Sequence, residues 1–260
     1  MTRRGLCTWL AAVALWPLGL LAAEAPRPTG TIAEGTEWAT AYLVQEGKRP
    51  GPTVLVVGGM HGDEVAGVKA ADQITQWPIV RGKLVVIPRA NEAALKKHSR
   101  LLPTDEDRNL NRDFPQSADD QPKGELARAI WEFVRQARPD WLLDLHEAIG
   151  VRQQLKTSTG STIIHDFKRD TRAQAEHMLE AINATIEDPT RKFVLLRGPI
   201  KGGIARSAAD LLGVHAMILE VTSTAQLLSL RSRQHQILVH RLLSDLEMLP
   251  PDFDPFAPGK

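Results

Sequence analysis

The sequence of 260 residues predicts one α/β domain in which helices cover both faces of a mostly parallel sheet. From about Trp38 onward, apolar strand-like runs alternate with helical patterns, the order typical of strand–helix–strand units. The strand-like runs are almost continuously apolar, as Val54–Val57 is, which is typical of parallel strands buried on both sides. The 43% apolar content is enough for a single core. We therefore expect a three-layer α/β/α domain.

Short apolar runs define the expected strands, and longer amphipathic patterns define the expected helices. In chain order, the strands are Ala39–Val44, Val54–Gly58, Lys83–Pro88, Trp141–Leu145, Phe193–Leu196 and Ala216–Val221. The helices are Asp63–Gln76, Glu125–Ala137, Arg172–Ile186, Ile204–Leu212 and Ser232–Leu249. Glu125–Ala137 has apolar residues at intervals of three and four, and it ends before Pro139, where helical backbone is disfavoured. Asn91–Gln121 is long, charged and without periodicity, so we expect a functional loop there.

The first 25 residues differ from the rest and indicate an export signal. Arg3 and Arg4 precede the apolar run Leu6–Leu21, and Ala23–Ala25 forms a small-x-small cleavage site. We expect cleavage, with no membrane span afterwards; a retained anchor is the alternative. The only cysteine, Cys7, lies in this segment, which excludes cysteine chemistry from the mature chain and suits a bacterial periplasm. We divide the chain into a signal peptide (1–25), a linker (26–36), a folded domain (37–250) and a C-terminal tail (251–260).

Three of the expected strands contain or precede histidine and glutamate side chains, which can bind metal ions or transfer protons. His61 and Glu64 follow the turn Gly58–Gly59 after the strand that begins at Val54. His146 directly follows Trp141–Leu145, and Glu220 lies in Ala216–Val221. Ligands bind at the carboxyl edge of open α/β sheets. Two histidines and one carboxylate, with a fourth position left to water, form a catalytic zinc set, which leaves Glu220 as the general base.

Each of these side chains also has an alternative interpretation. Glu64 can be a favourable charge at a helix start, and His146 can be a core histidine. Glu220 can form a buried ion pair with Arg197 or Arg206, because charges seldom lie in apolar strands without a partner.

Two carboxylates beside His146 have roles that the sequence leaves open. Asp144 lies on the same strand face as His146 and could support it or face a ligand. Glu147 could contact substrate or a neighbouring helix.

The long loop carries candidate groups for an anionic substrate. Asn111 and Arg112 can hold a carboxylate through an amide and a guanidinium, and Arg100 can neutralise an oxyanion formed at a carbonyl. A solvated basic loop is the alternative.

Together these segments resemble the M14-type zinc carboxypeptidase superfamily, and most closely its succinylglutamate desuccinylase/aspartoacylase branch. The matching motifs, in the family's order, are Gly58–Glu64, Asn91–Arg100, Asn109–Pro115, Asp144–Glu147 and Leu219–Glu220, within Pro52–Thr224. The resemblance implies that His61, Glu64 and His146 bind one zinc ion per chain. It also implies that Glu220 is the general base, that Arg100 polarises the scissile carbonyl, and that Asn111 and Arg112 bind a carboxylate.

The sequence departs from the family pattern at three points. Asn109 stands where the family commonly has aspartate. Peptidase members often place a tyrosine over the substrate, whereas the only tyrosine of this chain, Tyr42, lies near the N-terminus. The chain also ends without the C-terminal β-domain of the deacylase members, a plan similar to compact murein-peptide amidases.

We therefore expect a zinc hydrolase that cleaves an amide bond next to a free carboxylate, acting on small N-acyl amino acids. The alternative substrate is a peptidoglycan stem peptide, and a binding protein that keeps the zinc fold without catalysis is the alternative of another class. The charge is nearly balanced, with 32 basic and 31 acidic residues, so we expect no nucleic-acid partner.

Overall fold

The computed structural model describes residues 27–103 and 108–257, so the predicted signal peptide and Cys7 lie outside the described residues. Its centre is an eight-stranded sheet with the order β1-β2-β4-β3-β5-β8-β6-β7. The strands are β1 (Gly30–Ile32), β2 (Thr40–Glu46), β3 (Arg49–Val57), β4 (Arg81–Ile87), β5 (Trp141–Ala148), β6 (Thr162–His165), β7 (Val194–Arg197) and β8 (His215–Thr222).

The sheet is mixed, with a parallel centre. β4, β3, β5 and β8 run parallel to one another, and β7 is parallel to β6. The antiparallel pairs are β1 with β2, β2 with β4, and β6 with β8. The expected single α/β domain with a mostly parallel mixed sheet is confirmed.

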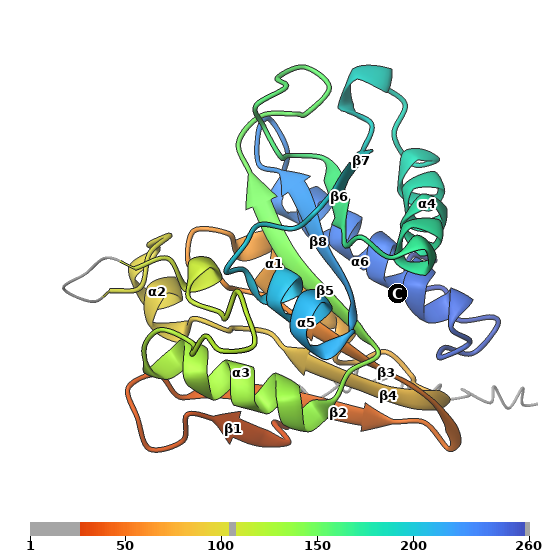
Figure 1. Ribbon diagram of the computed structural model, residues 1–260. Helices are drawn as coiled ribbons and strands as arrows, with labels where there is room; N and C mark the ends of the chain where they lie inside the picture. The colour runs from red at the N-terminus through yellow and green to blue at the C-terminus, as the bar shows by residue number, and fades with distance from the viewer. Residues whose placement is uncertain (1–26, 104–107, 258–260) are drawn as a thin grey trace, which may run out of the picture.

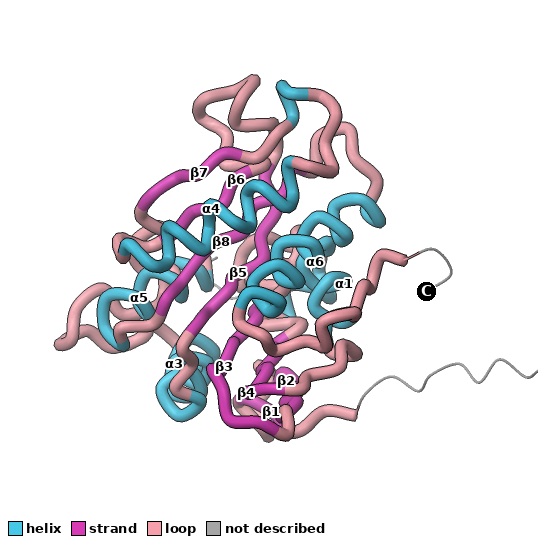
Figure 2. The backbone as a smooth tube through the Cα atoms, turned by 90° about the vertical axis from the view of Figure 1, so that its right-hand side faces the viewer, coloured by secondary structure: helices cyan, strands magenta, loops and turns pink. Residues whose placement is uncertain are grey.

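Helices cover both faces of this sheet (Figures 1 and 2). The helices are α1 (Val65–Ile74), α2 (Glu92–Lys97), α3 (Glu125–Ala137), α4 (Arg169–Asn183), α5 (Ile204–Leu212) and α6 (Leu228–Asp245), with short 3-10 turns η1 (Leu110–Arg112) and η2 (Pro189–Arg191). α1, α4 and α6 pack on one face, around core residues such as Leu143 and Met217. α3 and α5 pack on the other, around Leu142 and Ile218. Alternate residues of β5 and β8 thus enter opposite cores, as the two-residue period of a strand requires.

The structure differs from the sequence prediction in its shortest elements. β1, β6 and α2 were not expected, because they span only 3, 4 and 6 residues and so show too little periodicity. β1 lies inside the expected linker 26–36 and pairs with β2, while α2 lies inside the expected loop Asn91–Gln121. Pairing with neighbouring strands, rather than local pattern, fixes β1 and β6. The helix α2 begins where the side chain of Asn91 accepts from the backbone N–H of Ala94.

Strand register places the candidate site residues together. Val57 at the end of β3 pairs with Asp144 of β5, and His146 of β5 pairs with Glu220 of β8. The turn after β3, the end of β5 and the end of β8 therefore meet at one edge of the sheet. No helix within the described residues is long and apolar enough to cross a membrane.

Close backbone packing holds the turn that follows β3. The amide of Gly62 donates to the carbonyl of Ser99 at 2.8 Å, and a Cβ at Gly62 would collide with the backbone of Ala94 in α2. Glycine at 62 thus lets α2 lie directly against the His61–Glu64 turn.

We predict that Gly62→Ala lowers the free energy of unfolding by about 1–3 kcal/mol, the usual cost of overpacking. Gly213→Ala is the control, because a Cβ there meets no atom within 4 Å and only the positive φ of 73° opposes it. Urea unfolding followed by circular dichroism measures both. A Gly62→Ala variant as stable as the wild type would contradict the close approach of α2.

Candidate active site

The turn between β3 and α1 directs His61 and Glu64 inward. Gly59, with a φ of 68°, adopts a left-handed conformation that glycine takes without strain, and it reverses the chain after the strand. His61 and Glu64 are both buried, and His61 Nδ1 lies 2.8 Å from Glu64 Oε1.

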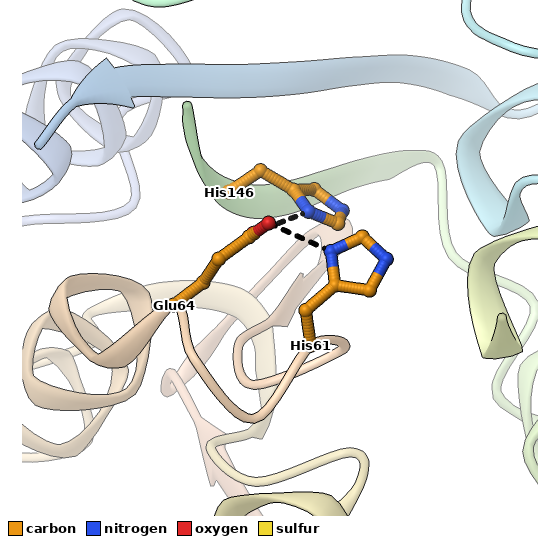
Figure 3. Close-up of side chains that lie close together, drawn as sticks. All are labelled: His61, Glu64 and His146. Atoms are coloured by element: carbon orange, nitrogen blue, oxygen red, sulfur yellow. Dashed lines mark hydrogen bonds and ion pairs between the residues drawn. The ribbon is translucent and has the colours of Figure 1, made fainter. Parts of the chain in front are cut away.

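His146 meets this pair from β5 (Figure 3). Its Nδ1 lies 2.8 Å from Glu64 Oε2, so the two imidazoles flank one carboxylate. One possible ligand atom from each of the three residues lies within 4.8 Å of the others. The structure therefore brings together the three side chains that the sequence predicted as metal ligands.

The outer nitrogens of both histidines face acceptors within the protein. His61 Nε2 lies 3.0 Å from Asn109 Oδ1, and His146 Nε2 lies 2.8 Å from Asp144 Oδ2. Protons on these Nε2 atoms leave the Nδ1 lone pairs directed at the centre of the cluster, an arrangement typical of histidine metal ligands. The donor set, two imidazole nitrogens and a carboxylate, fits a catalytic zinc site. Asn109, although not the family's aspartate, still offers an acceptor.

Opposite charges hold the cluster together without a metal ion. Burial opposes ionisation of Glu64, but His146 and His61 hold the pKa of this carboxyl well below its usual value. Burial also opposes protonation of His146, but Asp144 and Glu64 raise the pKa of the imidazole well above its usual value. A metal ion at this place would displace a proton from His146, so its binding would weaken as pH falls.

Glu220 lies beside His146 without a partner for one of its oxygens. Its Oε2 is buried and makes no hydrogen bond within the described residues. Burial, together with the negative charges of Glu64 and Asp144, raises the pKa of Glu220 to about 7, although His146 and Arg100 oppose this rise. The alternative ion pairs do not form, since Arg206 binds Asp210 and Arg197 stacks on Phe167. A carboxyl with this pKa can exchange a proton near neutral pH.

Two arginines of the long loop reach the same site. The guanidinium of Arg100 pairs with Glu64 Oε1. Arg112 is exposed and donates to the carbonyl of Asn111 at 2.6 Å. Burial of part of its side chain and the charge of Arg100 lower the pKa of Arg112, while the charge of Glu220 opposes this change.

The amide of Asn111 is bonded within the protein. Its Nδ2 donates to Asp144 Oδ2 at 3.5 Å, the same oxygen that accepts from His146 Nε2. Its Oδ1 accepts from the backbone N–H of Ile204 at 3.1 Å, at the start of α5. Asn111 therefore connects Asp144 of β5 with the first turn of α5.

Other residues around the cluster were left open or overlooked at the level of sequence. Asp144 supports His146, and the side chain of Glu147 contacts α1 and α6. Arg231 of α6, the partner of Glu147, carried no sequence signal, because an arginine in an amphipathic helix usually lies in solvent.

Comparison with known proteins agrees with this geometry. The sequence model of the succinylglutamate desuccinylase/aspartoacylase catalytic domain matches residues 50–246. The chain belongs to this family. The chain is 33% identical over 147 residues to N-alpha-acetyl-L-2,4-diaminobutyric acid deacetylase of Halomonas elongata. This match covers 54% of this chain and 41% of that protein.

Solved structures share the fold. Apo Csd4, a cell shape determinant protein of Helicobacter pylori, superposes with a TM-score of 0.71 at 20% identity, covering 83% of this chain and 56% of Csd4. A succinylglutamate desuccinylase/aspartoacylase of Rhodobacter sphaeroides superposes with a TM-score of 0.61 at 19% identity, covering 82% of this chain and 60% of that one. The matched part of this chain thus corresponds to 41% of the Halomonas protein, 56% of Csd4 and 60% of the Rhodobacter protein, or about half the length of these relatives.

The raised pKa of Glu220 predicts a pH-dependent stability of the metal-free protein. Between the usual value of 4.5 and about 7, folded Glu220 keeps a proton that the unfolded chain releases. The free energy of unfolding should therefore fall as pH rises through this range, by at most about 1.4 kcal/mol per pH unit from this group.

Glu220→Gln removes this contribution while keeping the shape of the side chain. Its stability relative to the wild type should rise from pH 4.5 to 7 and then level off, in urea unfolding with a chelator present. A difference between the two proteins that does not change with pH would contradict a buried, unpartnered Glu220.

Proposed function

We propose that this protein is a zinc-dependent hydrolase that cleaves an amide bond next to a free carboxylate, with N-acyl amino acids as substrates. The observation that carries the proposal is a cluster of two histidines and a glutamate beside Glu220, whose buried Oε2 makes no hydrogen bond within the described residues. A metal site and a proton acceptor side by side are what amide hydrolysis requires.

His61, Glu64 and His146 would hold one zinc ion per chain. When bound, zinc supplies Lewis-acid chemistry, since it polarises a carbonyl oxygen and makes water acidic near neutral pH. Asn109 and Asp144 keep the imidazole rings in the orientation that directs both Nδ1 atoms toward the Glu64 carboxylate, where the ion would bind.

Glu220 is the proposed general base. Its Oε2 takes a proton from the attacking water and then gives it to the nitrogen of the leaving amine. A pKa of about 7 before metal binding suits both directions of transfer, and the charge of a bound ion would favour the ionised form. Arg100 carries a positive charge beside Glu64 and stabilises the negative charge that develops on the carbonyl oxygen.

Arg112 is the proposed binding group for the substrate carboxylate. Its exposed guanidinium is held by the carbonyl of Asn111, so Asn111 supports the same subsite through its backbone. Charge-assisted bonds from a guanidinium favour a carboxylate over a neutral amide. The deacetylase name of the Halomonas relative is consistent with an acylated amino acid as substrate.

Peptidoglycan stem peptides are the second candidate substrate. They also end in carboxylates, and Csd4, which shares the fold, is described as a D,L-carboxypeptidase and has been solved with a tripeptide and with mDAP. Export to a bacterial periplasm, which we propose from the signal-like first 25 residues, would give access to them. A binding protein without catalysis is disfavoured, because it would have no use for Glu220 and Arg100 in one site.

The test is an assay of the zinc-loaded protein on N-acyl amino acids, muropeptides and the C-terminally amidated form of each. We expect release of the amine from carboxylate substrates. Glu220→Gln should lower kcat by roughly 10²–10⁴, the usual contribution of general acid–base catalysis. Equal turnover by wild type and Glu220→Gln would show that the measured activity does not come from this site.

Arg112→Ala separates binding from chemistry in the same assay. The substitution should mainly raise KM, because the substrate carboxylate is present before the reaction starts. It should also reduce the ratio of kcat/KM for the carboxylate substrate to kcat/KM for its amide. Arg128→Ala, an exposed arginine of α3, is the control. An Arg112→Ala variant that distinguishes the two forms as well as the wild type would place the carboxylate subsite elsewhere.

A further inference from the structure

A buried ion pair lies directly behind the histidine–glutamate cluster. Glu147 follows His146 in β5, and because side chains alternate along a strand, it points to the face covered by α1 and α6. Its side chain is 3% exposed, and its Oε2 pairs with Nη1 of Arg231, a residue of α6 that is 16% exposed. Charged side chains are seldom buried to this extent without a role.

Glu147 contacts the turn that carries Glu64 at two points. Its Oε1 accepts from the backbone N–H of Ala66 at 2.6 Å, in the first turn of α1, where helical N–H groups lack a partner within the helix. Its own backbone N–H donates to Glu64 Oε2 at 3.0 Å. Glu64 is the residue that immediately precedes α1, and its own side chain does not cap the N–H groups of the helix. The backbone of Glu147 therefore contacts the Glu64 carboxylate directly, and its side chain holds the first turn of the helix that follows Glu64.

Arg231 offsets the repulsion between two neighbouring carboxylates. Glu147 and Glu64 carry like charges beside one another, and within the described residues Arg231 is the cation that pairs with the Glu147 side chain. Removing one partner of a buried pair leaves an uncompensated charge, which forces the surroundings to rearrange. Here the surroundings include the first turn of α1 and the carboxylate of Glu64.

We propose that Glu147 and Arg231 are positioning residues that hold Glu64 in the orientation needed to bind the metal ion, and so set the affinity of the site. This inference rests on the metal site of the proposed function. Groups that orient metal ligands through hydrogen bonds typically change metal affinity by 10- to 100-fold when they are removed. The pair links α6 to the site, although α6 contributes none of the proposed metal ligands.

The test measures zinc affinity by competition with a chromophoric chelator, at a temperature where circular dichroism shows each variant folded. Arg231→Met, which keeps the length of the side chain, should weaken zinc binding by about 10- to 100-fold. Glu147→Gln keeps an acceptor for the N–H of Ala66 and should weaken binding less than Glu147→Ala, which loses it. Arg233→Met, an exposed arginine on the same helix, is the control and should bind zinc as the wild type does.

The outcomes separate the inference from a purely structural role. If the pair only anchors α6, Arg231→Met will lower the Tm of the metal-free protein while its zinc affinity stays at the wild-type value, and the inference is wrong. A wild-type protein that binds no zinc would contradict the proposed function, and this inference with it. A wild type that binds zinc, with Arg231→Met and Glu147→Ala equally tight, would contradict the inference alone.

Discussion

The carboxylate of Glu64 is the point on which the rest of the site depends. It accepts contacts from His61, His146, Arg100 and the backbone of Glu147, so three segments distant in sequence meet on two oxygen atoms. Burial alone would raise the pKa of this carboxyl, but the charges and hydrogen bonds of His146 and His61 hold it well below its usual value. The fold supplies this environment because the parallel strands β3 and β5 end at the same sheet edge.

The site divides charge between an inner and an outer layer. Inside, the carboxylates of Glu64, Asp144 and Glu220 surround His146, which suits a cation. Outside, Arg100 and Arg112 lie close enough to influence one another, which suits an anionic substrate. A ligand that brings a carboxylate to the arginines and a carbonyl to the inner cluster would match both layers. This division of charge favours the proposed hydrolase over the alternative of a binding protein without catalysis.

Much of this arrangement could be predicted from sequence because strand ends mark it. Val54–Val57 and Trp141–Leu145 are strand-like runs followed by histidines, so a parallel sheet predicted that His61, Glu64 and His146 lie at one edge, and the family resemblance predicted that they act together. Contacts that depend on packing between distant elements had no such marker. The bond from Asn111 to Ile204 and the pair of Glu147 with Arg231 join residues 93 and 84 positions apart, and neither motif nor periodicity encodes them. The short strands β1 and β6 escaped prediction for the same reason.

Metal content tests the central claim most directly. The purified protein, loaded with zinc and freed of excess ion, should retain about one zinc per chain, the number that a single three-ligand site holds. His61→Ala and His146→Ala should each lose it, while His177→Ala, an exposed histidine of α4, should retain it. Zinc retained at one per chain in both His61→Ala and His146→Ala would show that the ion lies elsewhere and would contradict the account.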